Sequence, residues 1–382
     1  MSPHNVADRY VYFQEVKRVV VKIGSNVLTA SHGLNIPIIE SISRQIHQLI
    51  QSNYEVILIT SGAMASGVKK IGLDRRPDEI PKRQAVAAVG QAGLILEYEK
   101  AFSQYGIKVA QVLLTGDDLR NRTRYLNARN TLNTLLSWKV IPIINENDTV
   151  AIDEIKFGDN DNLAAMITLL LDAHILINLT DIDGLYDRDP RTNSDARFIP
   201  IVSSISKTIE KQATGIPGAL GTGGMLTKII AARKLTSSGI PMVIANGFKE
   251  NILLRLFQHE PLGTFFIPKT QKLCCKKRWI GFTLKPKGKL FIDAGAQQAI
   301  LNGGKSLLPS GILHIEGEFD MGAPVEFSVA DGQVIGIGLV NYSSQEIEKI
   351  KGLKSSEIIS VLGSKPYDEI VHRDNLVIMV DT

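Results

Sequence analysis

The sequence contains little cysteine. Cys274 and Cys275 are the only two in 382 residues, and they are adjacent. A disulfide between neighbours closes no useful loop, and no histidine or cysteine pair stands at the spacing of metal ligands. We therefore interpret both as free thiols in a reducing compartment, and we expect a cytoplasmic protein.

Long apolar runs are also missing. Asp172 and His174 interrupt the most apolar stretch, residues 163–179, which leaves it too short and too polar to span a membrane. The first ten residues, MSPHNVADRY, have neither the basic start nor the apolar core of a signal peptide. We expect no membrane partner, and the length and 44% hydrophobic content are enough for two folded domains.

The chain has no large excess of one charge, because its formal net charge is only +4. The distribution is nevertheless uneven. From Arg278 onward there are ten Lys and Arg against thirteen Asp and Glu, a net charge of −3, so residues 1–277 carry +7. The first part therefore suits anionic ligands, and the second part is not typical of a nucleic-acid-binding domain.

Hydrophobic periodicity predicts alternating strands and helices in the first two thirds of the chain. Near-continuous apolar segments predict strands at 18–23, 55–60, 108–114, 139–144, 174–179 and 242–245. Helical spacing or buried apolar content predicts helices at 36–50, 82–104, 117–137, 163–171 and 225–237. Within 82–104, four apolar residues share one face: Ala85, Val89, Ala92 and Leu96. This alternation is typical of an α/β fold with a parallel sheet covered on both faces.

The pattern changes at residues 269–277, KTQKLCCKK, which we interpret as a basic linker. Short strand-like runs with turn signals follow it. We therefore predict an α/β domain at 1–268, a compact mostly β domain at 278–362 and a C-terminal tail at 363–382.

A glycine-rich segment, GTGGMLTK at 221–228, precedes one of the predicted helices. Its glycines permit positive φ, so backbone N–H groups can point at an anion together with the free N–H groups of the helix start. Lys228 lies about one turn into that helix. The spacing matches neither a Walker A loop nor the Rossmann glycine motif. A phosphate site and a plain helix cap both remain open for this segment alone.

Polar clusters follow several of the predicted strands, at 24–26, 61–62, 145–148, 180–181 and 246–247. The carboxyl ends of parallel strands meet at one edge of a sheet, and ligands bind there. Lys22 lies inside the first apolar strand, close to this edge. It could be an edge-strand lysine that reaches solvent, or a charge held for a ligand.

Asparagine and aspartate are concentrated in two segments, INENDTVA and FGDNDNLAA. Turns favour both residue types, and Asp161 could cap a helix, but these explanations account for only one or two of the residues. Amides and carboxylates together suit the ammonium group of an amino acid and can orient lysines. Neither segment contains a histidine, and no Ser-His-Asp order is apparent.

Eight segments occur in the order seen in the amino-acid kinase family and resemble its glutamate 5-kinase branch in particular. They are VVVKIGSN, ITSGAMASG, AVGQAGL, LNARNTL, PIINENDTVA, KFGDNDNLAA, LTDIDGLYDRDPR and GTGGMLTK. The later KRWI, LLPSGI and VHRD segments are similar to a PUA domain. The resemblance covers nearly the whole chain from about residue 17. It implies a three-layer sandwich around a mostly parallel sheet, followed by a small, mostly β PUA-like domain.

The resemblance implies roles for individual residues. Lys22 and Lys228 would stabilise the transferring phosphoryl group, and Asp161 would orient both lysines. Glutamate would be held by Ser61, Asp148, Asn160, Asn145 and Asp159. ATP would be bound by Lys22, Thr180, Asp181, Thr222, Gly223, Gly224, Met225, Leu226, Thr227 and Lys228. The family commonly has GTS where this chain has Gly24-Ser25-Asn26, so the resemblance assigns no role to Asn26.

The implied activity is ATP-dependent phosphorylation of the L-glutamate side-chain carboxylate, the first step of proline biosynthesis. Mg²⁺ would be bound mainly through the nucleotide phosphates, with no metal site made by the protein alone. Such enzymes are typically oligomers, here a homo-dimer or homo-tetramer, and are typically inhibited by proline. Three alternatives stay open: phosphorylation of another acid such as aspartate or carbamate, RNA binding by the C-terminal domain, and a non-catalytic regulatory relative.

Overall fold

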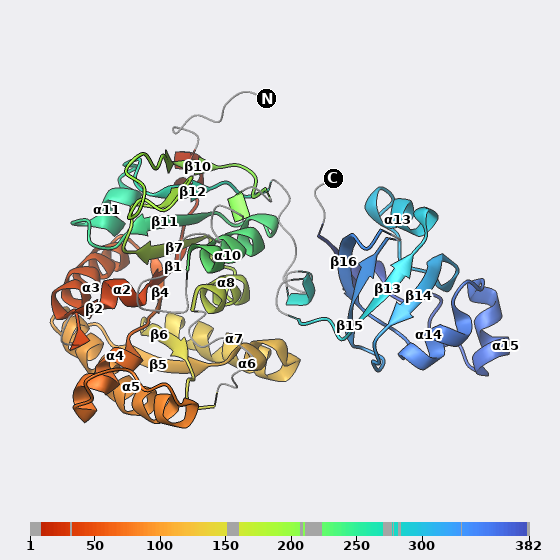
Figure 1. The fold of residues 1–382 in the computed structure, drawn as a ribbon, viewed down its shortest axis with the longest axis horizontal. Helices are drawn as coiled ribbons and strands as arrows, with labels where there is room; N and C mark the ends of the chain where they lie inside the picture. Colours follow the sequence, from red (N-terminus) through yellow and green to blue (C-terminus); the bar gives the residue numbers. More distant parts are fainter. Residues whose placement is uncertain are drawn as a thin grey trace. The chain divides into compact units, whose positions relative to one another are not determined.

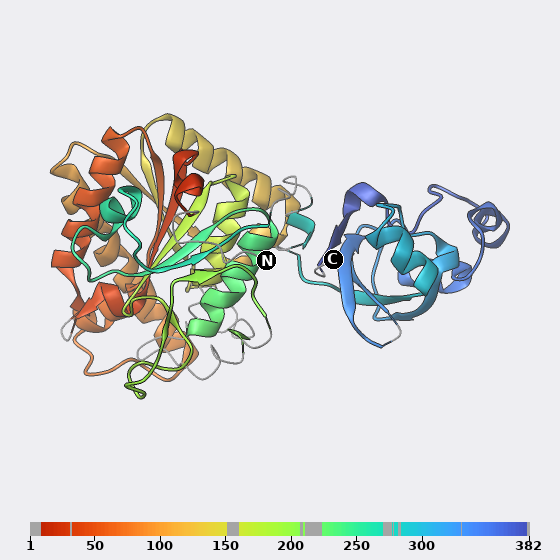
Figure 2. The same ribbon diagram turned by 90° about the horizontal axis from the view of Figure 1, so that it is seen from above.

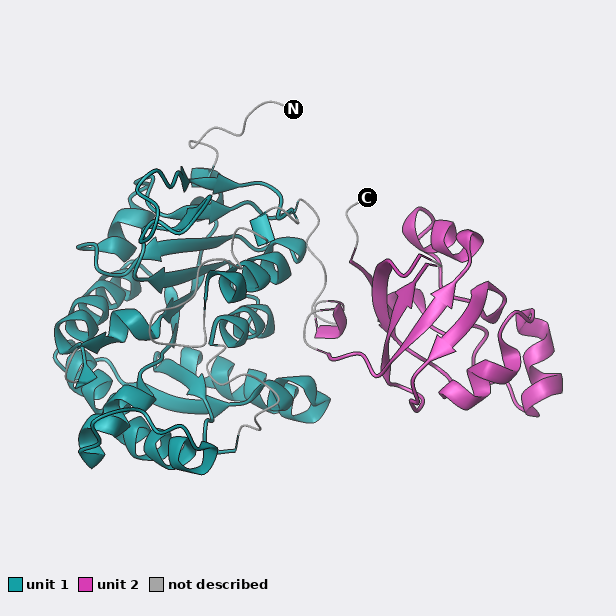
Figure 3. Ribbon diagram, in the orientation of Figure 1, with its two compact units in different colours: residues 1–272 teal, residues 273–382 magenta. Residues whose placement is uncertain are grey.

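The computed structural model shows two compact units, residues 1–272 and 273–382 (Figures 1 and 3). It describes residues 9–30, 33–150, 160–206, 209–210, 224–269, 277, 279–281, 284–329 and 331–379. The division falls within the segment that we interpret as a linker.

The first unit contains an eight-stranded sheet in the order β10-β12-β11-β7-β1-β4-β6-β5. Its strands are β1 (Arg18–Ile23), β4 (Glu55–Ile59), β5 (Val109–Leu114), β6 (Ile141–Glu146), β7 (Ile175–Thr180), β10 (Ile201–Val202), β11 (Met242–Asn246) and β12 (Thr264–Phe266). All neighbours from β11 to β5 pair in parallel, and only β12 pairs antiparallel with β11. This topology confirms the predicted mostly parallel sheet.

Helices cover both faces of this sheet (Figures 1 and 2). They are α1 (Tyr10–Gln14), α2 (Ser25–Leu28), α3 (Ile36–Gln51), α4 (Ala63–Ile71), α5 (Ile80–Ser103), α6 (Gly116–Arg120), α7 (Arg122–Ser137), α8 (Asn160–Leu170), α10 (Met225–Ser237) and α11 (Ile252–Phe257). Val19, Val21 and Ile23 of β1 pack into one core with residues of α3, α5 and α11. Because strand side chains alternate, Lys22 lies on the opposite face, where α8 packs against β1.

Helices α4 and α5 cross with their backbones in contact. A Cβ added to Gly90 would lie 1.7 Å from the Ala63 carbonyl oxygen, and one added to Gly67 would lie 1.9 Å from the Val86 carbonyl oxygen. Only glycine permits this approach. The crossing fixes α4 immediately after the Thr60-Ser61-Gly62 turn that ends β4.

The four apolar residues predicted to share a face of α5 do share one, but it is the exposed side of the helix. Val89 and Leu96 are 37% and 47% exposed, and Ala85 and Ala92 are exposed as well. The crossing with α4 turns the other side of α5 inward. That side buries Val86, Ala87, Gly90, Gln91, Leu94, Tyr98, Ala101 and Phe102.

The second unit has its own core and a five-stranded sheet in the order β14-β13-β15-β16-β17. Its elements are β13 (Gly288–Ile292), α13 (Ala294–Leu301), β14 (Ile312–Glu316), β15 (Pro324–Ser328), β16 (Val334–Leu339), α14 (Ser344–Ile350), α15 (Ile358–Leu362) and β17 (Leu376–Ile378). Strand β17 lies in the segment predicted as a tail, and it pairs antiparallel with β16. These residues are therefore part of the second sheet.

None of the helices in the described ranges combines the length and the apolar character that crossing a membrane requires.

Candidate active site

The predicted polar clusters meet at one edge of the first sheet. Strands β11, β7, β1, β4 and β6 are neighbours and run in the same direction, so their carboxyl ends lie together. Residues at or just beyond these ends are Gly24, Ser61, Asn145, Thr180 and Asn246.

Lys22 is not an edge-strand lysine, because β1 lies between β7 and β4. The residue is only 5% exposed, and its Nζ atom lies 2.7 Å from Oδ1 of Asp161. The sequence leaves two interpretations of Lys22 open. The structure supports the second one, in which the lysine is a charge held inside the protein.

Asp161 forms ion pairs with both predicted catalytic lysines. Nζ of Lys228 lies 3.1 Å from Oδ2 of Asp161, the other oxygen of the same carboxylate. Two neutral groups complete the shell: the Thr227 hydroxyl is 2.6 Å from Oδ2, and Asn178 Nδ2 donates to Oδ1 at 2.8 Å. A carboxylate has about four lone-pair sites, so these four partners saturate it.

The Asp161 carboxylate stays ionised despite being 1% exposed. Burial raises its pKa, but the charges of Lys22 and Lys228 and hydrogen bonds from Lys22 and Thr227 outweigh burial and hold the pKa well below its ordinary value. One buried carboxylate thus faces two buried ammonium groups. The cluster is suited to binding a further anion.

The starts of α8 and α10 meet at this cluster, since the two helices pack together. Asp161 lies in the first turn of α8, and Lys228 lies in the first turn of α10, whose N-cap is Gly224. Helix starts carry free N–H groups and a partial positive charge. They therefore add to the positive potential of the two lysines.

A second group of contacts surrounds Asn160, the residue before Asp161. Its Nδ2 atom lies 3.0 Å from three acceptors: the Thr60 carbonyl oxygen, Ser61 Oγ and Asn145 Oδ1. Its own Oδ1 is buried and has no hydrogen-bond partner within the described ranges. We call Ser61, Asn145 and Asn160 the amide cluster. It combines three of the five residues predicted to hold glutamate.

Asp148 follows β6 and is half-buried. Burial raises the pKa of its carboxyl to about 6, and the positive charge of Arg76 lowers it in part. Sequence reasoning did not select Arg76, which lies in the loop between α4 and α5. The fifth predicted glutamate ligand, Asp159, lies outside the described residues.

The carboxylate of Asp181, just after β7, accepts hydrogen bonds from Thr180 and Asn26. Thr180 Oγ1 donates to Oδ1 of Asp181 at 3.0 Å, and Asn26 Nδ2 donates to Oδ2 at 2.9 Å. The amide thus links the turn after β1 to the turn after β7. This contact gives a structural role to the position that departs from the family pattern.

Part of the glycine-rich segment can be placed. Gly224 is extended and caps α10, Met225 is buried, and Leu226 and Thr227 lie in the first helical turn. Thr222 and Gly223 lie outside the described residues. The described half therefore brings Thr227 and Lys228 to Asp161, as the phosphate-site interpretation requires.

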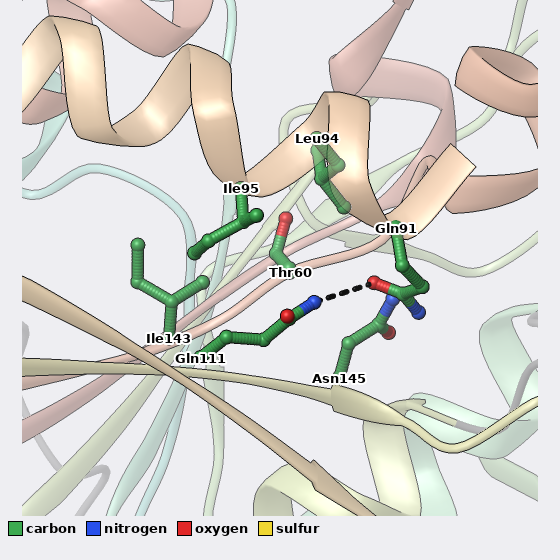
Figure 4. Close-up of a pocket in the computed structure, with 7 residues that line it drawn as sticks. All are labelled: Thr60, Gln91, Leu94, Ile95, Gln111, Ile143 and Asn145. Atoms are coloured by element: carbon green, nitrogen blue, oxygen red, sulfur yellow. Dashed lines mark hydrogen bonds between the residues drawn. The ribbon is translucent and has the colours of Figure 1, made fainter. Parts of the chain in front are cut away.

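A small pocket lies beside Asn145, one residue of the amide cluster (Figure 4). It is lined by Thr60, Gln91, Leu94, Ile95, Gln111, Ile143 and Asn145, and the space between them is too small for a water molecule. Gln111 donates to Gln91 Oε1, and Gln91 donates to the Glu146 carbonyl oxygen, both at 3.4 Å. These contacts connect the buried side of α5 to the end of β6.

Sequence reasoning also missed Asn178 as a site residue. The available signal was an isolated amide in the apolar strand ILINLT, which is buried along its whole length. An amide in such a strand must have a partner, because burying it alone costs free energy. The sequence could not show that the partner is Asp161.

Comparison with known proteins agrees with this geometry. The model of the amino acid kinase family matches residues 17–246, and the PUA domain model matches residues 288–362. The chain belongs to the amino acid kinase family. Family membership confirms the resemblance carried by the eight segments, and it identifies the protein as a kinase and hence as an enzyme that uses ATP.

Curated relatives match nearly the whole chain. A glutamate 5-kinase from Geobacter sulfurreducens is 52% identical over 96% of this chain and 98% of its own length. A glutamate 5-kinase from Syntrophus aciditrophicus is 51% identical over 97% of both chains. A solved UMP kinase from Ureaplasma parvum is far more distant, at 17% identity and a TM-score of 0.46 over 66% of this chain.

Proposed function

We propose that this chain transfers the γ-phosphoryl group of ATP to the side-chain carboxylate of L-glutamate, giving L-glutamyl 5-phosphate and ADP. This reaction is the first step of proline biosynthesis. The observation that carries the proposal is the buried Lys22–Asp161–Lys228 cluster beside the amide cluster. Glutamate 5-kinases about 50% identical over nearly the full length support the choice of acceptor.

The chemistry fits these residues. A glutamate side chain has a pKa of about 4.3 in water, so it arrives ionised and needs no general base. The barrier is the approach of one anion to another. Lys22 and Lys228 neutralise charge on the transferring group, while Asp161 keeps both ammonium groups in position.

The amide cluster supplies complementary contacts for the acceptor. Asn160 Oδ1, which has no hydrogen-bond partner among the residues that the structure describes, is an acceptor for the ammonium group of an amino acid, and the Asp148 carboxylate offers a second one. Ser61 and Asn145 are held beside Asn160. We assign glutamate binding to these four residues and to Asp159.

We assign ATP binding to Lys22, Thr180, Asp181 and residues 222–228. Mg²⁺ supplies additional charge neutralisation when it accompanies the nucleotide. The four partners of Asp161 leave this carboxylate no lone pair for a metal, and the described residues include no group of three metal-ligating side chains. We propose that Mg²⁺ is bound mainly through the phosphates, because this ion dehydrates reluctantly and usually takes only one or two protein carboxylates besides substrate phosphates.

ADP release with a set of acceptors tests the proposed function. L-Glutamate should give the highest kcat/KM among glutamate, aspartate, carbamate, N-acetylglutamate and UMP. Hydroxylamine should trap the acyl phosphate product as a hydroxamate. A higher kcat/KM with another acceptor would overturn the assignment of glutamate.

We also propose a homo-oligomer in which α5 packs against α5 of a second copy. The exposed face of α5 carries Ala85, Ala88, Val89, Ala92 and Leu96, so its centre has no charge, which is unusual for a solvent-facing helix. An antiparallel pairing about a two-fold axis is self-complementary. It matches Lys82 with Glu99, Ala85 with Leu96, and Val89 with Ala92.

Light scattering after gel filtration tests this interface. Leu96→Glu should reduce the particle mass, because it places two buried carboxylates opposite small alanines. Leu313→Glu is the matched control, since Leu313 is also exposed but lies in the second unit. An unchanged mass for Leu96→Glu would exclude this face.

Proline is the proposed feedback inhibitor. It carries the same α-carboxylate and a charged amino group, so the amide cluster is the chemically suitable place for it. Proline should raise the apparent KM for glutamate and leave that for ATP unchanged. Inhibition that glutamate does not relieve would place proline elsewhere.

A further inference from the structure

Asn178 lies in the middle of β7. On the same face of this strand, the side chain before it is apolar and the one after it is Thr180. Asn178 is 0% exposed, and it pairs in register with Lys22 on the neighbouring strand β1. Partners in a parallel pair point to the same side of the sheet. The amide therefore lies directly beside the lysine, on the face covered by α8.

The four donors around Asp161 are arranged in matched pairs. Oδ1 faces the Lys22 ammonium at 2.7 Å and the Asn178 amide at 2.8 Å. Oδ2 faces the Lys228 ammonium at 3.1 Å and the Thr227 hydroxyl at 2.6 Å. Each carboxylate oxygen thus has one charged and one neutral partner.

The two neutral partners can fix the orientation of the Asp161 carboxylate, which the lysines cannot do alone. Rotation of a carboxylate about its last side-chain bond has a broad energy profile, so the lysines alone define its plane poorly. Lysine side chains are also flexible, and their ammonium groups turn toward phosphate oxygens when these are present. An amide on a fully buried strand does not move in this way.

We propose that Asn178 is a positioning residue that fixes the plane of the Asp161 carboxylate, so that each oxygen faces one catalytic lysine. The inference rests on the proposed function. It predicts that loss of the amide lowers kcat while substrate binding changes little, because Asn178 is fully buried and its amide donates to Asp161.

Asn178→Leu removes the donor and keeps a similar volume. We expect kcat to fall by about 10-fold to 100-fold, the effect of one hydrogen bond to a charged group, with both KM values within about threefold. Leu176→Ala is the matched control, because Leu176 is equally buried on the same face of β7. It should lower the melting temperature and leave kcat nearly unchanged.

Asn178→Asp gives a readout that a purely structural role would not affect. An ionised Asp at this position cannot donate, and it repels Asp161, so kcat at pH 8 should fall at least as far as in Asn178→Leu. Protonation restores a donor, so the loss should shrink as the pH is lowered toward 6.

The inference is overturned if Asn178→Asp retains wild-type kcat at pH 8. It is also overturned if Asn178→Leu loses no more kcat than Leu176→Ala. Should Asn178→Leu fail to fold, Asn178→Ser replaces it, because its hydroxyl is too short to reach Asp161. The comparison uses whichever acceptor the wild-type enzyme phosphorylates, so failure of glutamate as substrate is distinguishable from failure of this inference.

Discussion

The two halves of the site differ in how the fold supports them. The lysine cluster consists of side chains from β1, β7, α8 and α10 that are joined by short contacts to Asp161, and all of them except the half-buried Thr227 are buried. The acceptor half uses the ends of β4 and β6 and continues into the loop that contains Asp148. The half proposed to neutralise phosphoryl charge is therefore held by buried contacts, and the half proposed to select the acceptor lies partly on a loop. Variants of the first half should change kcat, and variants of the second should change the KM for glutamate.

The largest effect is expected from Lys228→Ala and Lys22→Ala. Removing preorganised charge from a buried site costs on the order of 100-fold to 1,000-fold in kcat. Circular dichroism should show a folded protein, and single-turnover assays should show the loss. Near-normal turnover of purified Lys228→Ala would contradict the mechanism.

Asp161→Asn should combine a large loss of kcat with a loss of stability. The substitution keeps the shape but leaves two buried ammonium groups without their counter-ion, which costs about 3–5 kcal/mol. Urea unfolding measures the stability, and steady-state assays measure kcat. A variant as stable as the wild type would mean that the lysines reach other partners.

A smaller effect should follow the titration of Asp148. Its pKa of about 6 means that the carboxylate is lost as the pH falls below 6, so the KM for glutamate should rise there. Asp148→Asn should have a higher KM that no longer changes between pH 5.5 and 7.5. A pH-dependent KM in that variant would assign the titration to another group.

The smallest effect is expected from Asn26→Ser, which introduces the residue that the family commonly has. The shorter side chain loses the hydrogen bond to Asp181, so the KM for ATP should rise by about threefold, the effect of a neutral donor at the edge of the site. The KM for glutamate should stay constant. A change in the KM for glutamate alone would show that Asn26 does not contribute to nucleotide binding.

Local patterns in the sequence predicted most of the first sheet. Strand β1 spans Arg18–Ile23 as predicted, because a β-branched run ends at a glycine. Strand order is not a local property, so the sequence left open whether Lys22 lay on an edge strand. The same limit applies to β17, whose partner β16 is more than thirty residues earlier.

The exposed face of α5 shows a second limit. Apolar spacing predicted which residues share a face, but the side that turns inward depends on the glycine contact between α4 and α5. For the site, the sequence and the family resemblance identified Lys22, Asp161 and Lys228. The partner of Asn178 could not be predicted, because Asp161 lies on another element. The roles of all these residues stay predictions until they are tested.

Asn160 and Asp161 are consecutive residues in the first turn of α8, yet each belongs to a different half of the site. Their Cα atoms are about 3.8 Å apart, as across any trans peptide bond. In the proposed function Asn160 would face the amino acid backbone and Asp161 would align the lysines, so a single peptide bond limits the separation of these two groups. An acceptor one methylene shorter, such as aspartate, would hold its carboxylate short of the phosphoryl group. We therefore expect the fixed spacing of these two residues to favour glutamate over shorter acceptors.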